Sequence, residues 1–143
     1  MKGDRKLAEQ LARMMNKARR ALDSAAREIA DDNFDFSCSR SYYAAFYCME
    51  GLLLTKGLTY SKHSAVLSGF SEQFLKTNVF DRQLSKRITR LFRDRQLGDY
   101  GFDVPLDCAQ AQQCLEDAKD IYSKTEEYLS KAKLLDAGKP GSS

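Results

Sequence analysis

Proline is nearly absent from this chain, and its absence strongly constrains the fold. The 143 residues contain prolines only at positions 105 and 140. Proline interrupts helices because its ring blocks the backbone and removes an N–H donor, so long helices can run on either side of residue 105. Apolar residues recur there every three or four positions, and no segment alternates as a half-buried strand does. We therefore predict an all-α fold, an antiparallel bundle of four to five helices.

The first two predicted helices differ in how much surface they bury. Residues 7–29 carry one apolar stripe, which ends before Asp31. Residues 35–56 carry two faces that both look buried, one bulky and one built from small side chains, namely Ser41, Ala44, Ala45, Cys48 and Gly51. Small residues allow a neighbouring helix to approach closely, so this helix should lie at the centre of the bundle. Glu50 lies on its bulky face without an obvious local partner.

Turn and capping residues divide the rest of the chain into three further helices. Ser61 is placed to cap a short third helix, and Asp81 to cap the fourth. Gly98 and Gly101 bracket the end of the fourth helix, and Pro105 introduces a long fifth one.

Length and composition favour one small intracellular domain. We predict a single domain over residues 1–137 and a flexible Gly/Pro/Ser tail over 138–143. No apolar stretch is long enough to cross a membrane, and no signal peptide is recognisable. The four cysteines contain no C-x-x-C pair, which favours reduced core thiols and a cytoplasmic location. A net charge of +3 is too small to indicate nucleic-acid binding by itself.

The sequence lacks the motifs of the common catalytic sites. Serine nucleophile elbows, Walker loops and dinucleotide glycine fingerprints are absent. His63 is the only histidine, so any acid or base role for an imidazole falls on it, although it can equally be a residue that packs at a helix start. One histidine without metal-ligand spacing predicts no metal site, and we expect no cofactor.

The segment from Arg95 to Tyr100 places a cation where a helix should be apolar. The apolar stripe of the fourth helix consists of Leu84, Ile88, Leu91 and Phe92. With about 100° of rotation per residue, Arg95 lies within about 20° of Ile88, and Asp99 stays in the same arc. A charge in such a stripe costs several kcal/mol unless it is paired or faces a cleft. Arg95 is therefore either neutralised by Asp99 or directed at a ligand.

A phosphate-sized cleft is one possible destination for Arg95, because several tyrosines could supply polar groups beside it: Tyr42, Tyr43, Tyr47 and Tyr100. A second basic set lies on the opposite side of the fourth helix, at Arg82, Lys86, Arg90 and Arg93. Such a set is most often a solvated face, and a contact surface for a phosphate backbone is the alternative.

Four blocks of sequence together resemble the small stand-alone HEPN domains of bacteria and archaea. They are residues 39–47 (SRSYYAAFY), 62–66 (KHSAV), 74–77 (FLKT) and 95–100 (RQLGDY). The resemblance covers about residues 5 to 133 and implies a four-to-five-helix bundle. It also implies a homodimer in which the arginine motif of each subunit faces a shared cleft. Arg95 matches the motif arginine and Gln96 its usual polar follower.

The resemblance implies one of two activities. Many HEPN domains are metal-independent ribonucleases, often toxins, with a histidine four to six residues after the arginine. Others accompany a minimal nucleotidyltransferase in a toxin–antitoxin-like pair. Positions 100 to 102 hold Tyr100, Gly101 and Phe102 instead of histidine, and tyrosine, with a pKa near 10, is a poor base at neutral pH.

The leading hypothesis is therefore a binding module that partners a minimal nucleotidyltransferase and holds a nucleotide or RNA phosphate. The residues assigned to that site are Arg95, Gln96, Asp99, Tyr100, Tyr43 and Tyr47. The enzyme alternative is a metal-independent ribonuclease with an altered acid/base set drawn from Arg95, Tyr100 and His63. A purely structural scaffold, in which Arg95 and Asp99 only secure the helix end, is the third possibility.

Overall fold

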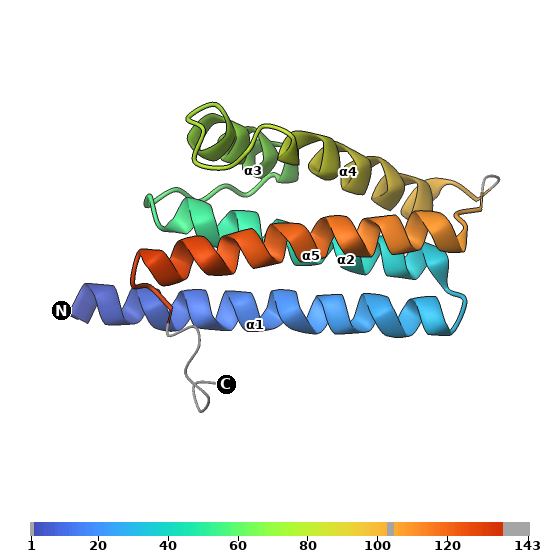
Figure 1. Cartoon of the computed structure of the whole chain (residues 1–143), viewed down its shortest axis with the longest axis horizontal. Coiled ribbons are helices and arrows are strands. Elements are labelled where there is room, and N and C mark those ends of the chain that lie inside the picture. Colours follow the sequence, from blue (N-terminus) through green and yellow to red (C-terminus); the bar gives the residue numbers. More distant parts are fainter. Residues whose placement is uncertain (1, 103–104, 136–143) are drawn as a thin grey trace.

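The protein consists of helices packed side by side, as a computed structural model that describes residues 2–102 and 105–135 shows (Figure 1). The elements are α1 (Lys2–Ala30), α2 (Phe34–Leu54), α3 (His63–Phe70), the π-helical segment η1 (Ser71–Leu75), α4 (Leu84–Tyr100) and α5 (Cys108–Lys131). No strand occurs within the described residues. The predicted all-α class is confirmed. The predicted tail, residues 138–143, lies outside the described residues.

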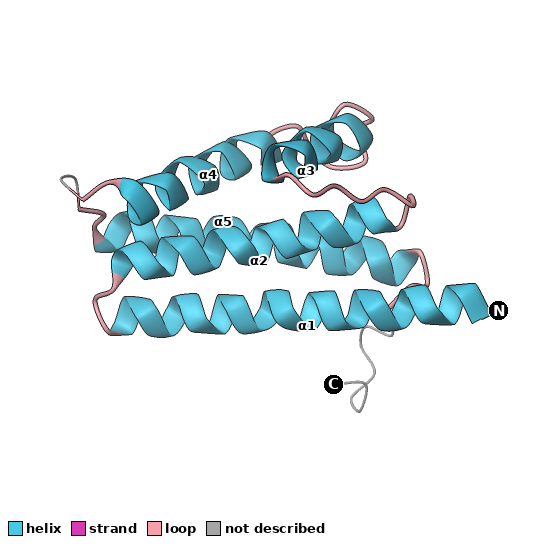
Figure 2. Cartoon of the chain, turned by 180° about the vertical axis from the view of Figure 1, so that it is seen from behind, coloured by secondary structure: helices cyan, strands magenta, loops and turns pink. Residues whose placement is uncertain are grey.

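The bundle is arranged around α2, as its two buried faces predicted. The long helices α1, α2, α4 and α5 alternate in direction along the chain, so α2 and α5 point the same way (Figure 1). Seen from the front and from behind, α2 and α5 lie between α1 on one side and α3 with α4 on the other (Figure 2). The helix α2 therefore contacts α1, α3, α4 and α5.

Small side chains make that central position possible. The whole small-residue face of α2, from Ser41 to Gly51, is buried. A methyl group added to Gly51 would stand 3.5 Å from Leu11 Cδ2, which shows how closely α1 packs there. The α1–α2 turn is fixed by Ser37, whose hydroxyl donates a hydrogen bond of 2.8 Å to the carbonyl of Ala25. Both observations tie α1 to α2 as an antiparallel pair.

Aromatic side chains fill one end of the bundle. The rings of Phe70, Phe74 and Phe80 lie with their centroids 5.5 to 6.0 Å apart, and Tyr128 of α5 meets Phe74 edge-on at 5.6 Å. The π-helical turn η1 directs Phe74 into this cluster, where it is fully buried. Wider turns of this kind are rare in helices, and apolar spacing gave no sign of it.

Two predicted helix starts differ from the observed ones by one or two residues. The residue at the start of α3 is Lys62, with no side-chain cap, so Ser61 does not cap this helix. The carboxylate of Asp81 accepts a hydrogen bond of 2.8 Å from the backbone N–H of Gln83, but α4 itself begins at Leu84. At α5 the cap is Asp107, which forms a reciprocal capping box with Gln110.

The end of α4 at Tyr100 lies between Gly98 and Gly101, as predicted, with Gly98 inside the last helical turn. A methyl group at Gly98 would stand 3.0 Å from the carbonyl oxygen of Asp35. The glycine is therefore needed for close contact between the end of α4 and the start of α2. Gly101 does lie directly after the last helical residue, as predicted.

The cysteines are free thiols, but they do not all lie in the core. Cys38, Cys48 and Cys114 are buried, as predicted, whereas Cys108 is exposed at the first turn of α5. The prediction of a core position is wrong for Cys108, since its small neighbours in the sequence face solvent at the helix start. No helix among residues 2–102 and 105–135 is long and apolar enough to cross a lipid bilayer.

Candidate functional site

Arg95 lies on the side of α4 that faces α2, and its guanidinium contacts two kinds of partner. Its Nε is 2.9 Å from the Asp99 carboxylate, one turn later in the helix. Its Nη2 donates a hydrogen bond of 3.1 Å to the hydroxyl of Tyr43 on α2. Only 14% of the Arg95 side chain is exposed. Arg95 is thus both paired with Asp99 and packed against the tyrosines of the central helix.

The rings of two tyrosines hold the guanidinium from α2. The central guanidinium carbon of Arg95 lies 5.1 Å from the ring centroid of Tyr42 and 5.6 Å from that of Tyr43. Contacts of this length between a cation and an aromatic face are attractive, and more so when water is excluded. The rings therefore restrict the position of the charge before any ligand arrives.

The donors of Arg95 are not all satisfied. Its buried Nε lies close to Asp99 but makes no hydrogen bond of acceptable geometry, so this ion pair is a charge contact and not a directed bond. A guanidinium has five N–H donors in a planar fork, and Tyr43 accepts from one of them. The arrangement leaves donors for a planar or tetrahedral oxyanion, which arginine commonly binds in this way.

His63 joins the same cluster, although it is far from Arg95 in the sequence. Its Nδ1 lies 3.3 Å from the hydroxyl of Tyr42. Its ring stacks on Phe46 with centroids 4.2 Å apart and meets Tyr43 edge-on at 5.9 Å. The first turn of α3 therefore does reach the tyrosines that hold Arg95, a point that the sequence left open.

The protonation states of His63 and Tyr42 follow from their burial. Burial raises the pKa of Tyr42 to about 12, so its hydroxyl keeps its proton at neutral pH. Burial, and then the positive charge of Arg95, lower the pKa of His63. A neutral ring carries its proton either on Nε2, in which case the Tyr42 hydroxyl donates to Nδ1, or on Nδ1, which then donates to that hydroxyl. In the second case Nε2 has its lone pair free to accept a proton.

The other predicted site residues lie outside this cluster. Gln96 is exposed on α4, and Tyr100 is 69% exposed at its end. Tyr47 lies one turn along α2 from Tyr43, with ring centroids 6.2 Å apart and the ammonium of Lys17 over its face at 4.8 Å. Among the predicted phosphate ligands, the structure thus brings together Arg95, Asp99 and Tyr43, with Tyr47 beside them.

Tyr42 and Phe46 were absent from the residues assigned to the site, although Tyr42 was among the tyrosines predicted to lie beside Arg95. Tyr42 is almost fully buried, and Phe46 follows it one turn later on the same side of α2. Phe46 looks like an ordinary core residue in sequence. The signal that could have found them is the run of four aromatic residues among positions 42–47, opposite a helix that carries an arginine in its apolar stripe.

The basic set on the far side of α4 is partly internal. Arg90 donates two hydrogen bonds, of 2.7 and 2.8 Å, to the fully buried carboxylate of Asp117 on α5. Arg87 donates another of 2.6 Å to the same carboxylate. Arg93 is 3.0 Å from the buried Asp94. The prediction of a fully solvated face is therefore wrong for Arg90, because a carboxylate 27 residues away neutralises it.

Comparison with known proteins agrees with this arrangement of helices. The HEPN domain family model matches residues 11–128. The chain belongs to the HEPN domain family. It is 33% identical over 126 residues to a protein of Methanocaldococcus jannaschii named as a candidate toxin, covering 88% of this chain and 86% of that protein. It is 37% identical to a UPF0332 protein of Thermotoga maritima, covering 83% of this chain and 85% of the relative.

The crystal structure of the protein TT1696 from Thermus thermophilus shares the fold of this HEPN chain. The two superpose with a TM-score of 0.71 at 19% sequence identity, over 82% of this chain and 97% of TT1696. At that identity the likeness concerns the fold alone.

Metal chemistry has no obvious ligand set in this HEPN domain. Nowhere in the described ranges do three or more His, Cys, Asp or Glu side chains gather as metal ligands. The chemistry available at the site is that of a fixed guanidinium, two tyrosine hydroxyls and one imidazole.

The single histidine allows a direct test of the electrostatics at this site. We expect the His63 pKa to lie below the ordinary value near 6.5, and Arg95→Gln to raise it by removing a nearby positive charge. A folded-state pKa below the unfolded one means that stability falls as pH drops below about 6.5. The ring signals of His63, followed by NMR across pH 4 to 8, measure both effects. A pKa at or above 6.5, or one that Arg95→Gln leaves unchanged, would contradict the described contacts.

Proposed function

We propose that this HEPN protein binds a phosphate group of RNA or of a nucleotide at Arg95, as one member of a toxin–antitoxin-like pair. The observation that carries the proposal is the guanidinium held by Tyr42, Tyr43 and Asp99 with N–H donors to spare. A guanidinium that is already ordered loses little side-chain entropy when it binds an oxyanion. The toxin part rests on the name of the archaeal relative.

A binding measurement with matched arginine variants tests the proposal. A labelled single-stranded RNA is titrated in EDTA with wild type, Arg95→Ala and Arg20→Ala, and its anisotropy is followed. Charge-assisted hydrogen bonds contribute about 1.5–3 kcal/mol, so Arg95→Ala should weaken binding about 10- to 100-fold. Arg20 is exposed on α1, and its removal takes away the same charge with little expected loss.

One further variant and a folding control keep this test decisive. Arg95→Lys retains the charge but not the planar fork, and should bind more weakly than wild type if the fork matters. Circular dichroism of each variant establishes that the bundle is still folded. Equal RNA and nucleotide affinities for wild type and a folded Arg95→Ala protein would refute the assignment of this site.

A ribonuclease is the second candidate, and the position of His63 favours it. The imidazole, within 3.3 Å of the Tyr42 hydroxyl beside Arg95, could accept the proton of an attacking 2′-hydroxyl and, as the imidazolium so formed, return it to the leaving oxygen of the cleaved phosphodiester. The same RNA samples, run on a denaturing gel, report cleavage. Metal-independent cleavage that is lost in both Arg95→Ala and His63→Gln would support the enzyme, and bound but intact RNA would exclude it.

The partner and the oligomeric state belong to the same proposal. We propose a homodimer that associates with a minimal nucleotidyltransferase, and the support is the family resemblance carried by residues 95–100. Sedimentation of the purified chain, alone and after co-expression with a minimal nucleotidyltransferase, measures both. A monomer in each preparation would contradict this part of the proposal without affecting the phosphate site.

A further inference from the structure

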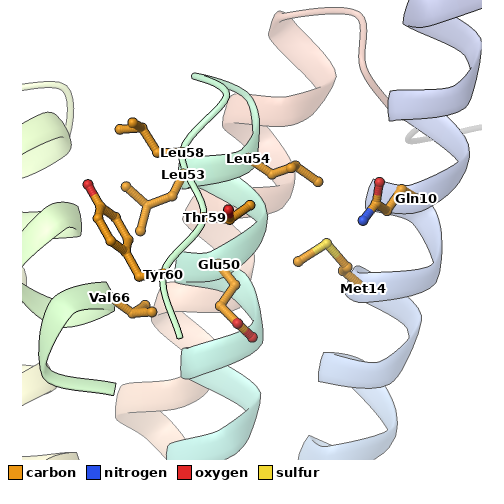
Figure 3. Close-up of a pocket in the computed structure, with 9 residues that line it drawn as sticks. All are labelled: Gln10, Met14, Glu50, Leu53, Leu54, Leu58, Thr59, Tyr60 and Val66. Carbon is orange, nitrogen blue, oxygen red and sulfur yellow. The ribbon is translucent and has the colours of Figure 1, made fainter. Parts of the chain in front are cut away.

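A second candidate site lies away from the arginine, in a pocket between α1 and the segment that follows α2. Its volume is about 160 Å³. Figure 3 shows Met14 of α1 on one side, Tyr60 and Val66 on the other, and Glu50 of α2 between them. Leu53 and Leu58 complete much of the apolar wall. None of these residues contacts Arg95 through an ion pair or hydrogen bond.

Among the described residues that line this pocket, Glu50 is the only charged one, and Gln10 and Thr59 add polar groups to the wall. Glu50 forms no ion pair or hydrogen bond with any residue in the ranges 2–102 and 105–135, and burial raises its pKa, an effect that Lys17 opposes. The ammonium of Lys17 lies over the ring of Tyr47. A half-buried carboxylate without a hydrogen-bond partner is costly unless a positive group approaches it.

The size of the pocket limits which ligand could bring a positive group to Glu50. Apolar cavities of about 150 Å³ in other proteins accommodate benzene, so this pocket suits one small ring or a short branched chain. Its apolar lining favours a hydrocarbon body, and Glu50 favours a cationic head. We propose that the pocket binds a compact apolar amine, with its hydrocarbon against Met14, Leu53 and Val66 and its ammonium on the Glu50 carboxylate.

The contact between Tyr60 and Gly69 controls the shape of this pocket. Gly69 lies on α3, and a methyl group there would stand 2.8 Å from Cε2 of Tyr60. That distance is too short, so the ring of Tyr60 would have to move. Because Tyr60 forms one wall, Gly69→Ala changes the pocket without altering Glu50.

Benzylamine and benzyl alcohol form a matched pair of probes, since they share the ring and differ in charge. We expect wild-type protein to bind benzylamine at least about 10-fold more tightly than benzyl alcohol. Glu50→Gln should remove that preference while leaving the affinity for benzyl alcohol unchanged. Glu116→Gln, which alters an exposed glutamate on α5, is the control and should behave as wild type. Methyl signals of Leu53 and Val66 in NMR titrations locate the bound probe.

Several results would overturn the proposal. One is equal benzylamine affinity in wild type and Glu50→Gln. Another is no binding of either probe, or binding that leaves the Leu53 and Val66 signals unshifted. Gly69→Ala gives an independent check, because it should weaken both probes together, and unchanged affinity for both would place them outside the pocket. RNA binding by Glu50→Gln should match wild type, which separates this site from the one at Arg95.

Discussion

Replacing Phe74 with alanine is expected to lower the free energy of unfolding by about 3–5 kcal/mol. Phe74 is fully buried and contacts Phe70, Phe80 and Tyr128. Its removal therefore loses the transfer free energy of a large ring and leaves a cavity where α5 meets η1. The surrounding rings cannot all collapse into that space, since they belong to separate elements.

Urea unfolding followed by circular dichroism measures this effect. Phe102→Ala is the matched control, because Phe102 is 93% exposed and its loss should change stability by less than about 0.5 kcal/mol. A decrease below about 1 kcal/mol for Phe74→Ala would mean that the aromatic cluster is not a packed part of the core.

Replacing Asp117 with alanine is expected to cost about 2–3 kcal/mol. The carboxylate is fully buried and accepts hydrogen bonds from Arg87, Arg90 and Gln113. Removal of one partner from a fully buried ion pair usually lowers the free energy of unfolding by more than this amount. Here the side chains of Arg87 and Arg90 are 36% and 34% exposed, so water can partly solvate them.

The same urea experiment tests Asp117 against two controls. Asp117→Asn keeps the shape of the side chain and removes its charge, and it should fall between alanine and wild type. Asp23→Ala removes an exposed carboxylate of α1 and should be nearly neutral. If Asp117→Ala and Asp23→Ala changed the free energy of unfolding equally, the ion pairs of Asp117 with Arg87 and Arg90 would not stabilise the fold.

Apolar spacing predicted most of the helices because the buried face of each helix is marked by apolar residues within that same helix. The pairing of Arg95 with Asp99 could be anticipated in the same way, since both lie on one helix a single turn apart. The central position of α2 followed from its two buried faces. Apolar faces and ion pairs one turn apart depend on the residues of a single helix, so they can be predicted from the sequence of that helix.

Contacts between helices depend on how far each helix is rotated and shifted against its neighbour, which spacing within one helix does not record. The bond between Arg95 and Tyr43 joins residues 52 positions apart. Asp117 neutralises arginines 27 and 30 positions away. The sequence therefore predicted a more solvent-exposed basic set on α4 than the structure has. His63 could be singled out as the only imidazole, but its contact with Tyr42 required the fold.

The wide sequence separation within the arginine site has a consequence for synthesis on the ribosome. Helices α1 and α2 are adjacent in the chain and can pair early, because closing a short connection costs little entropy. The site additionally needs the start of α3 and the last turn of α4, which ends at Tyr100. Domains form from the N-terminus as the chain emerges. We therefore expect nascent chains shorter than about 100 residues to be helical but unable to bind phosphate.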